Sequence, residues 1–127
     1  MQQLNAQDLR LAQVGERLLE ANRALCRHEM PVTGMVLHSR DQYSDRIAGD
    51  AFANGSVTVA VVVPGSPAEM AGIRAGDGLA AIGSRQVSQM TPTGDSPLRD
   101  TALGALADQV GRSPLSLTLS RDGSTRA

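Results

Sequence analysis

The sequence has few of the residues on which many binding and catalytic sites depend. Its 127 residues include one cysteine, one tyrosine, one phenylalanine and no tryptophan. A single cysteine excludes an intramolecular disulfide, and so few aromatic side chains provide no platform for stacking nucleic-acid bases. The formal net charge of -1 lacks the positive excess that is typical of proteins binding nucleic acid or anionic membranes. We therefore expect no nucleic-acid partner.

Long apolar runs are also missing. Hydrophobic residues make up 41% of the chain and charged residues 20%, which is typical of a globular domain. No stretch approaches the roughly 20 apolar residues that a membrane-spanning helix needs. We expect no direct membrane insertion, and the length favours one domain with room for an appendage.

Candidates for catalysis or metal binding are few. His28 begins a sequence like the zinc-protease helix motif, but Val32 stands where that motif needs its second histidine. Cys26 and His28 lie two residues apart and so on different faces of a helix, which argues against a nucleophile and base pair. Ser66 lacks the second glycine of a nucleophile elbow. We expect no catalytic residue, no metal site and no cofactor.

Residues 1–30 show the spacing of an amphipathic helix. Apolar side chains recur at intervals of three, four and seven residues, at Leu11, Val14, Leu18 and Leu25. The pattern predicts a helix from about Ala6 to Arg27, which starts after Asn5 and stops before Pro31. We expect its apolar stripe to be buried, either on the rest of the chain or in a homodimer. Residues 1–30 are thus predicted to be an N-terminal helical extension, and residues 31–127 the main domain.

The main domain alternates short strands with two capped helices. Strands are predicted at 32–38, 57–63, 79–82, 86–87 and 115–120, with a brief helix at 44–52. Ser66 and the proline after it begin a short helix that Gly72 ends. A second Ser-Pro pair at 96–97 begins a longer helix from Leu98 to Val110. The expected fold is α+β: a partly open antiparallel barrel or sandwich of five or six strands with two helices, plus the N-terminal extension.

Four segments of the main domain carry a family resemblance in their order and spacing. They read VVVPGSPA at 61–68, AGIRAGD at 71–77, LADQVG at 106–111 and LTLSRDG at 117–123. From about Pro31 to Gly123 the chain resembles a PDZ domain of the bacterial, protease-associated type. The segments ALC at 24–26, GMVLHS at 34–39 and QY at 42–43 resemble a narrower group, in which a PDZ domain accompanies a zinc metallopeptidase domain. The resemblance implies a PDZ-like fold with a shortened last strand, a piece of a longer protein, and a periplasmic or cell-envelope location.

PDZ domains bind extended peptides, usually C termini, as an added strand. The resemblance therefore implies a non-catalytic module that captures peptides or protein C termini for an attached protease. It places the site residues in a carboxylate loop of Val32, Thr33, Gly34 and Met35, a receiving strand of Met35, Val36, Leu37 and His38, and a groove wall of Leu103, Gly104 and Ala107. Two alternatives stay open: a structural or self-association module without a working groove, and a solvent-facing position for His38.

Overall fold

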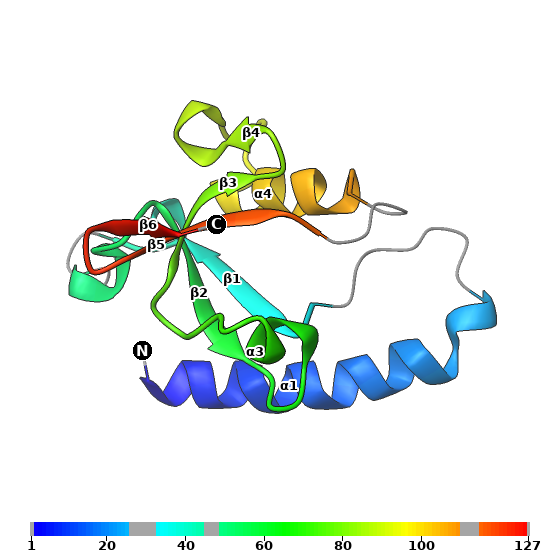
Figure 1. Ribbon diagram of the computed structural model, residues 1–127. Helices are drawn as coiled ribbons and strands as arrows, with labels where there is room; N and C mark the ends of the chain where they lie inside the picture. Colours follow the sequence, from blue (N-terminus) through cyan, green and yellow to red (C-terminus); the bar gives the residue numbers. More distant parts are fainter. Residues whose placement is uncertain (1, 26–32, 45–48, 110–114, 127) are drawn as a thin grey trace.

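The fold was described from a computed structural model, which describes residues 2–25, 33–44, 49–109 and 115–126 (Figure 1). The helices are α1 (Gln2–Ala21), α3 (Pro67–Met70) and α4 (Leu98–Ala107), with short 3-10 turns η1 (Arg23–Leu25), η2 (Arg40–Gln42), η3 (Gly49–Phe52) and η4 (Val87–Gln89). The strands are β1 (Met35–Ser39), β2 (Val57–Val62), β3 (Gly78–Ile82), β4 (Arg85–Gln86), β5 (Leu117–Arg121) and β6 (Ser124–Arg126). Among the described residues, no helix is long and apolar enough to cross a bilayer.

The six strands form one antiparallel sheet, which confirms the predicted α+β class. Their order is β1-β2-β3-β5-β6, and β4 pairs with β3 beside this path. β1 is therefore an end strand with β2 as its neighbour. In their register Met35 lies opposite Val62 and Ser39 opposite Val57, with a bulge that leaves Ala60 of β2 unpaired. The last strand, β6, has three residues.

The core lies between the sheet and α4. Its buried members are aliphatic: Leu37, Val57, Val59, Ala68, Ile73, Leu79, Ile82, Val87, Ala102, Ala105, Leu106 and Leu119. The odd-numbered positions of β1 face this core, because Leu37 belongs to it and Met35 packs against it. α4 turns Ala102, Ala105 and Leu106 toward the same core.

The short helix α3 forms as its local sequence predicts. Ser66 is the N-cap and its Oγ accepts from the Glu69 N–H at 3.3 Å. Gly72 ends the turn with φ of +82°, a conformation in which glycine is strongly favoured. One detail differs from a full capping box: the Glu69 carboxylate accepts from the Gly65 N–H at 2.6 Å, and the Ser66 N–H donates to Val63 O instead.

Several predicted helix boundaries are wrong. α1 begins at Gln2 rather than Ala6, and Asn5 lies inside it, because glutamine, leucine and alanine all favour helix. It ends at Ala21, where the Asn22 side chain donates to Leu18 O at 2.8 Å. The predicted end at Arg27 lies outside the described residues, as do Val110 at the predicted end of the second helix and 45–48 within the predicted helix at 44–52.

The apolar stripe of α1 does not pack on the main domain, which was one of the two places expected for it. Its side chains are largely exposed, at 71% for Leu11, 52% for Val14, 60% for Leu18 and 79% for Leu25. α1 instead lies along β1 and β2 with its other face (Figure 1). The partly buried residues of α1 are Asn5, Asp8, Leu9, Ala12, Gln13, Gly15 and Glu16. Most of them are polar or small, so hydrophobic periodicity alone does not locate the face that docks.

Candidate functional site

The backbone of β1 presents alternate residues to its open edge. Gly34 O, just before β1, accepts from the Val63 N–H at 2.7 Å. Just after β1, the Arg40 N–H donates to Ser56 O, beside the start of β2, at 2.8 Å. Even-numbered positions of β1 therefore direct their backbone groups toward β2. Because these groups alternate along a strand, Met35 and Leu37 direct theirs toward the open edge.

The open edge ends at Ser39. Its N–H also points away from β2, but it already donates to Gln42 Oε1 at 2.8 Å. Gln42 lies in η2, directly after the strand, and so folds back over the edge. The segment left for an added strand runs from Met35 to Leu37, which is shorter than the stretch to His38 that the resemblance implied.

The loop before β1 turns two N–H groups outward. Thr33 O accepts from the Ala68 N–H at 2.9 Å, and Gly34 O accepts from the Val63 N–H. In a trans peptide the C=O and the following N–H point in opposite directions. The N–H groups of Gly34 and Met35 are therefore directed away from the connection at 63–68. The Met35 N–H has only a long contact, 3.5 Å, with Thr33 Oγ1, and Val32 lies outside the described residues.

Gly34 is required by a close approach within the domain. Its φ is +77°, and a side chain at this position would overlap with the Ser66 side chain. The glycine thus lets the loop pack under the N-terminus of α3. A contact within the domain therefore accounts for the glycine in the predicted carboxylate loop.

The helix α4 lies against β1 from the core side. Leu103 is partly buried and packs against the core, as does Met35 from β1. Ala107 is partly buried and Gly104 exposed. The three predicted wall residues therefore lie on a different side of α4 from Ala102 and Leu106, which face the core.

Asp41 links the end of β1 to the start of α4. Its Oδ2 accepts from the Leu98 N–H at 2.7 Å, and its Oδ1 accepts from the Ser39 hydroxyl. The sequence predicted Ser96 as the helix cap, which is wrong: the N-cap is Pro97, and it makes no side-chain capping bond. A carboxylate from another segment supplies the acceptor that an N-cap side chain usually provides. Sequence reasoning missed Asp41, because the two partners lie 57 residues apart.

His38 is neither solvent-facing nor directed to the open edge. It is 7% exposed, and its Nε2 lies 3.2 Å from Asp8 Oδ2 of α1. Its Nδ1 lies 2.7 Å from the Tyr43 hydroxyl. Both nitrogens are satisfied when Nε2–H donates to Asp8 and Nδ1 accepts from Tyr43. Burial, and then the charge of Asp8, raise the pKa of Tyr43.

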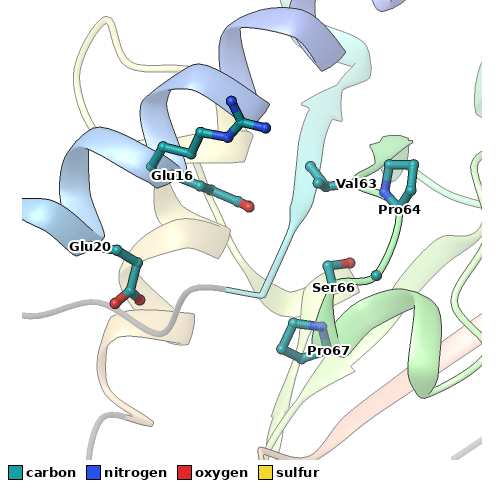
Figure 2. Close-up of a pocket in the computed structure, with 8 residues that line it drawn as sticks. Glu16, Glu20, Val63, Pro64, Ser66 and Pro67 are labelled. Atoms are coloured by element: carbon teal, nitrogen blue, oxygen red, sulfur yellow. The ribbon is translucent and has the colours of Figure 1, made fainter.

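A separate hollow of about 550 Å³ lies between α1 and the β2–α3 connection (Figure 2). It is lined by Glu16, Arg17, Glu20, Val63, Pro64, Gly65, Ser66 and Pro67. No predicted site residue lines it, so it is distinct from the space between β1 and α4. In the described part of the chain, no three His, Cys, Asp or Glu side chains gather as a metal site; Cys26 and His28 lie outside that part.

In a comparison with protein families, residues 58–95 match the model of a PDZ domain. The comparisons with curated proteins and with solved structures returned no match. The matched segment holds β2 from its second residue onward, with α3, β3, β4 and η4, and covers less than a third of the chain. Together with the fold it supports a PDZ-like, peptide-binding interaction module, a class that is generally non-catalytic. β1 and α4 lie outside the matched segment.

Proposed function

We propose that this PDZ-like module, formed by residues 31–127, binds an extended peptide by adding it as a strand to β1. The observation that carries the proposal is the outward-facing backbone of Met35 and Leu37 on an end strand that lies beside α4. In strand addition, main-chain hydrogen bonds give affinity and adjacent pockets select side chains. Residues 1–30 act as an extension of the module rather than as part of the groove.

A peptide C terminus fits the start of β1. The N–H groups of Gly34 and Met35 point away from the 63–68 connection, and two neighbouring N–H donors suit a carboxylate. The last side chain of the peptide would lie among Met35, Leu103 and Ala107, which are apolar. We therefore expect a preference for peptides that end in an apolar residue.

The affinity should be modest. The open edge spans only Met35 to Leu37, because Gln42 covers the next donor. So short a pairing must offset the ordering of the peptide, and we expect dissociation constants of about 1 µM or weaker.

A peptide titration tests the proposal. Fluorescence anisotropy with labelled peptides that end in apolar residues should show binding, and amidation of the C terminus should weaken it. Ala107→Trp should abolish binding by filling the groove, whereas Ala53→Trp, at an exposed position outside β1 and α4, should bind like the parent chain. Equal binding by both variants, or no binding by the parent chain, would favour the structural module instead.

We also propose that the module serves a protease of the cell envelope. The support is the resemblance of 24–26, 34–39 and 42–43 to PDZ domains that accompany zinc metallopeptidases. The gene on either side of this segment tests the idea. A metallopeptidase domain with an export signal is expected, and a neighbouring domain of another class would contradict it.

A further inference from the structure

The outer face of α1 and η1 carries an apolar line that the peptide groove does not use. Leucines recur every seven residues and a valine lies between two of them; we call Leu4, Leu11, Val14, Leu18 and Leu25 the leucine stripe. Each is at least 52% exposed. At about 100° per residue, a seven-residue interval returns to nearly the same side of a helix. The members within α1 therefore form one line along it.

The opposite face of α1 is already occupied. Asp8 bonds to His38 of β1 at 3.2 Å, and Glu16 lines the hollow beside the β2–α3 connection. Figure 1 shows α1 on the outside of the domain, where it contacts β1 and β2. The helix thus presents mostly polar and small groups, with Leu9 among them, to its own domain and the leucine stripe to solvent, unlike an ordinary amphipathic surface helix. The contacts of α1 with its own domain therefore leave the leucine stripe exposed to solvent.

We propose that the leucine stripe is the seam of a homodimer, in which the α1 helices of two copies pair in parallel. A seven-residue repeat of apolar side chains is the pattern by which helices form coiled coils. A second copy carries the same repeat, so a twofold axis along the helices brings each leucine beside its equivalent. A second copy of the chain therefore has a surface that matches the leucine stripe.

The charges of α1 and η1 argue for a protein partner over a lipid surface. Three acidic and three arginine residues balance there: Asp8, Glu16, Glu20, Arg10, Arg17 and Arg23. Helices that lie on anionic membranes have a polar face rich in basic residues. Summed over α1 and η1, the charges give no such basic excess.

The positions of two arginines favour the parallel arrangement. Arg10 and Arg17 flank one side of the stripe, and Gly15 and Asn22 flank the other side. Antiparallel helices would bring the arginine sides of both copies together, with like charges in contact. Parallel helices place each arginine side against the partner's side that carries Gly15 and Asn22. Charge repulsion therefore selects the parallel pair.

The area of the leucine stripe sets the expected strength of the dimer. Full burial of a leucine or valine removes roughly 60–120 Å² of apolar surface from water. These side chains are 52–79% exposed, so five from each copy give roughly 400–750 Å², before the flanking residues are counted. Interfaces of stable complexes generally exceed about 1,000 Å² in total. We therefore expect a weak dimer that forms at high protein concentration.

Sedimentation velocity of the 127-residue chain, from about 1 µM to 1 mM, tests the proposal. We expect a dimer whose dissociation constant rises at least about a hundredfold in the double variant Leu11→Glu and Leu18→Glu. The matched control is Ala6→Glu and Ala24→Glu, which adds the same charge at exposed positions off the stripe and should leave the dimer intact. Circular dichroism of each variant confirms that the helix is retained.

Cysteine crosslinking reports the orientation. In a Cys26→Ser background, Gln7→Cys should crosslink to itself in a parallel pair, and so should Ala21→Cys. An antiparallel pair would join position 7 to position 21 in a mixture of the two variants, which would overturn the parallel arrangement. A monomer at every concentration, or a dimer that survives the stripe variant, would overturn the seam. A monomer that binds vesicles of neutral and anionic lipids would assign the stripe to a membrane surface. Peptide binding by the groove is unaffected by any of these results.

Discussion

Asp41 accepts the Leu98 N–H at 2.7 Å and so fixes the start of α4 to the turn that follows β1. Its other carboxylate oxygen accepts from the Ser39 hydroxyl. The two walls of the proposed groove, β1 and α4, are therefore joined by one side chain. The spacing between them depends on a residue that contacts no peptide.

Asp41→Ala should weaken both the fold and the groove. Loss of the capping acceptor should lower the free energy of unfolding by about 1–2 kcal/mol, measured by urea denaturation. Peptide affinity should also fall, because α4 loses its link to β1. Asp95→Ala, in the exposed loop before α4, is the matched control. Unchanged stability and affinity in Asp41→Ala would show that the bond from Asp41 to the Leu98 N–H does not set the spacing between β1 and α4.

Gly34→Ala should destabilise the domain by at least about 2 kcal/mol, because the added methyl overlaps with Ser66 and the residue keeps a φ of +77°. Gly104→Ala provides the contrast: its methyl would meet nothing within 4 Å. A helical glycine replaced by alanine should raise stability by about 0.5–1 kcal/mol. Thermal unfolding of both variants measures the difference. A Gly34→Ala protein as stable as the parent would refute the close packing under α3.

Asp77 should make stability depend on pH in the acidic range. The carboxylate is 2% exposed, and Arg121 donates to both of its oxygens, with Nε to Oδ1 at 2.6 Å. The Arg121 hydrogen bond, against the opposing effect of burial, lowers the pKa of Asp77 below its usual value. The folded state therefore holds this proton less tightly than the unfolded chain. The stabilisation is complete above the unfolded pKa of about 3.9 and is lost as the pH falls through the folded pKa.

Urea denaturation between pH 7 and pH 2.5 measures this dependence. We expect the midpoint to fall steeply below about pH 4. Arg121→Met should lower the midpoint at pH 7 and flatten the acidic decline. Arg85→Met removes an exposed pair with Asp108 at 3.4 Å and should change little, since exposed pairs contribute little. If the denaturation midpoint of Arg121→Met falls as far at acidic pH as that of the parent chain, the fall is due to other carboxyl groups.

Asp8→Ala should loosen α1 from the sheet. The helix is held at this point through the bond from Asp8 to the buried His38, so its loss should speed hydrogen exchange over residues 2–21. Glu20→Ala, at an exposed position of the same helix, should leave exchange unchanged. Equal protection in the two variants would show that α1 docks without this bond.

Local signals in the sequence predicted the parts of the fold that depend on neighbouring residues. Ser66 and Gly72 define α3 because a cap and a left-handed stop act within one turn. Buried strands were recognised from their β-branched runs, and β2 matches its prediction within one residue. These features need no knowledge of distant segments.

The parts that the sequence did not predict depend on distant partners. Asp41 caps a helix 57 residues away, and the buried His38 bonds to the carboxylate of Asp8, 30 residues earlier. Periodicity located the apolar stripe of α1 correctly, but it could not show that Asp8 and its neighbours would face the sheet instead. The candidate groove was placed by resemblance, and the structure narrowed its edge through the Ser39 and Gln42 bond.

The most direct test of the groove is a nuclear magnetic resonance titration of the labelled chain with a peptide that ends in an apolar residue. Strand addition to β1 predicts that the amide signals of Gly34, Met35 and Leu37 shift together and that their hydrogen exchange slows. Ala107→Trp should abolish these changes. Shifts confined to the hollow lined by Glu16 and Pro67, with β1 unperturbed, would contradict strand addition to β1.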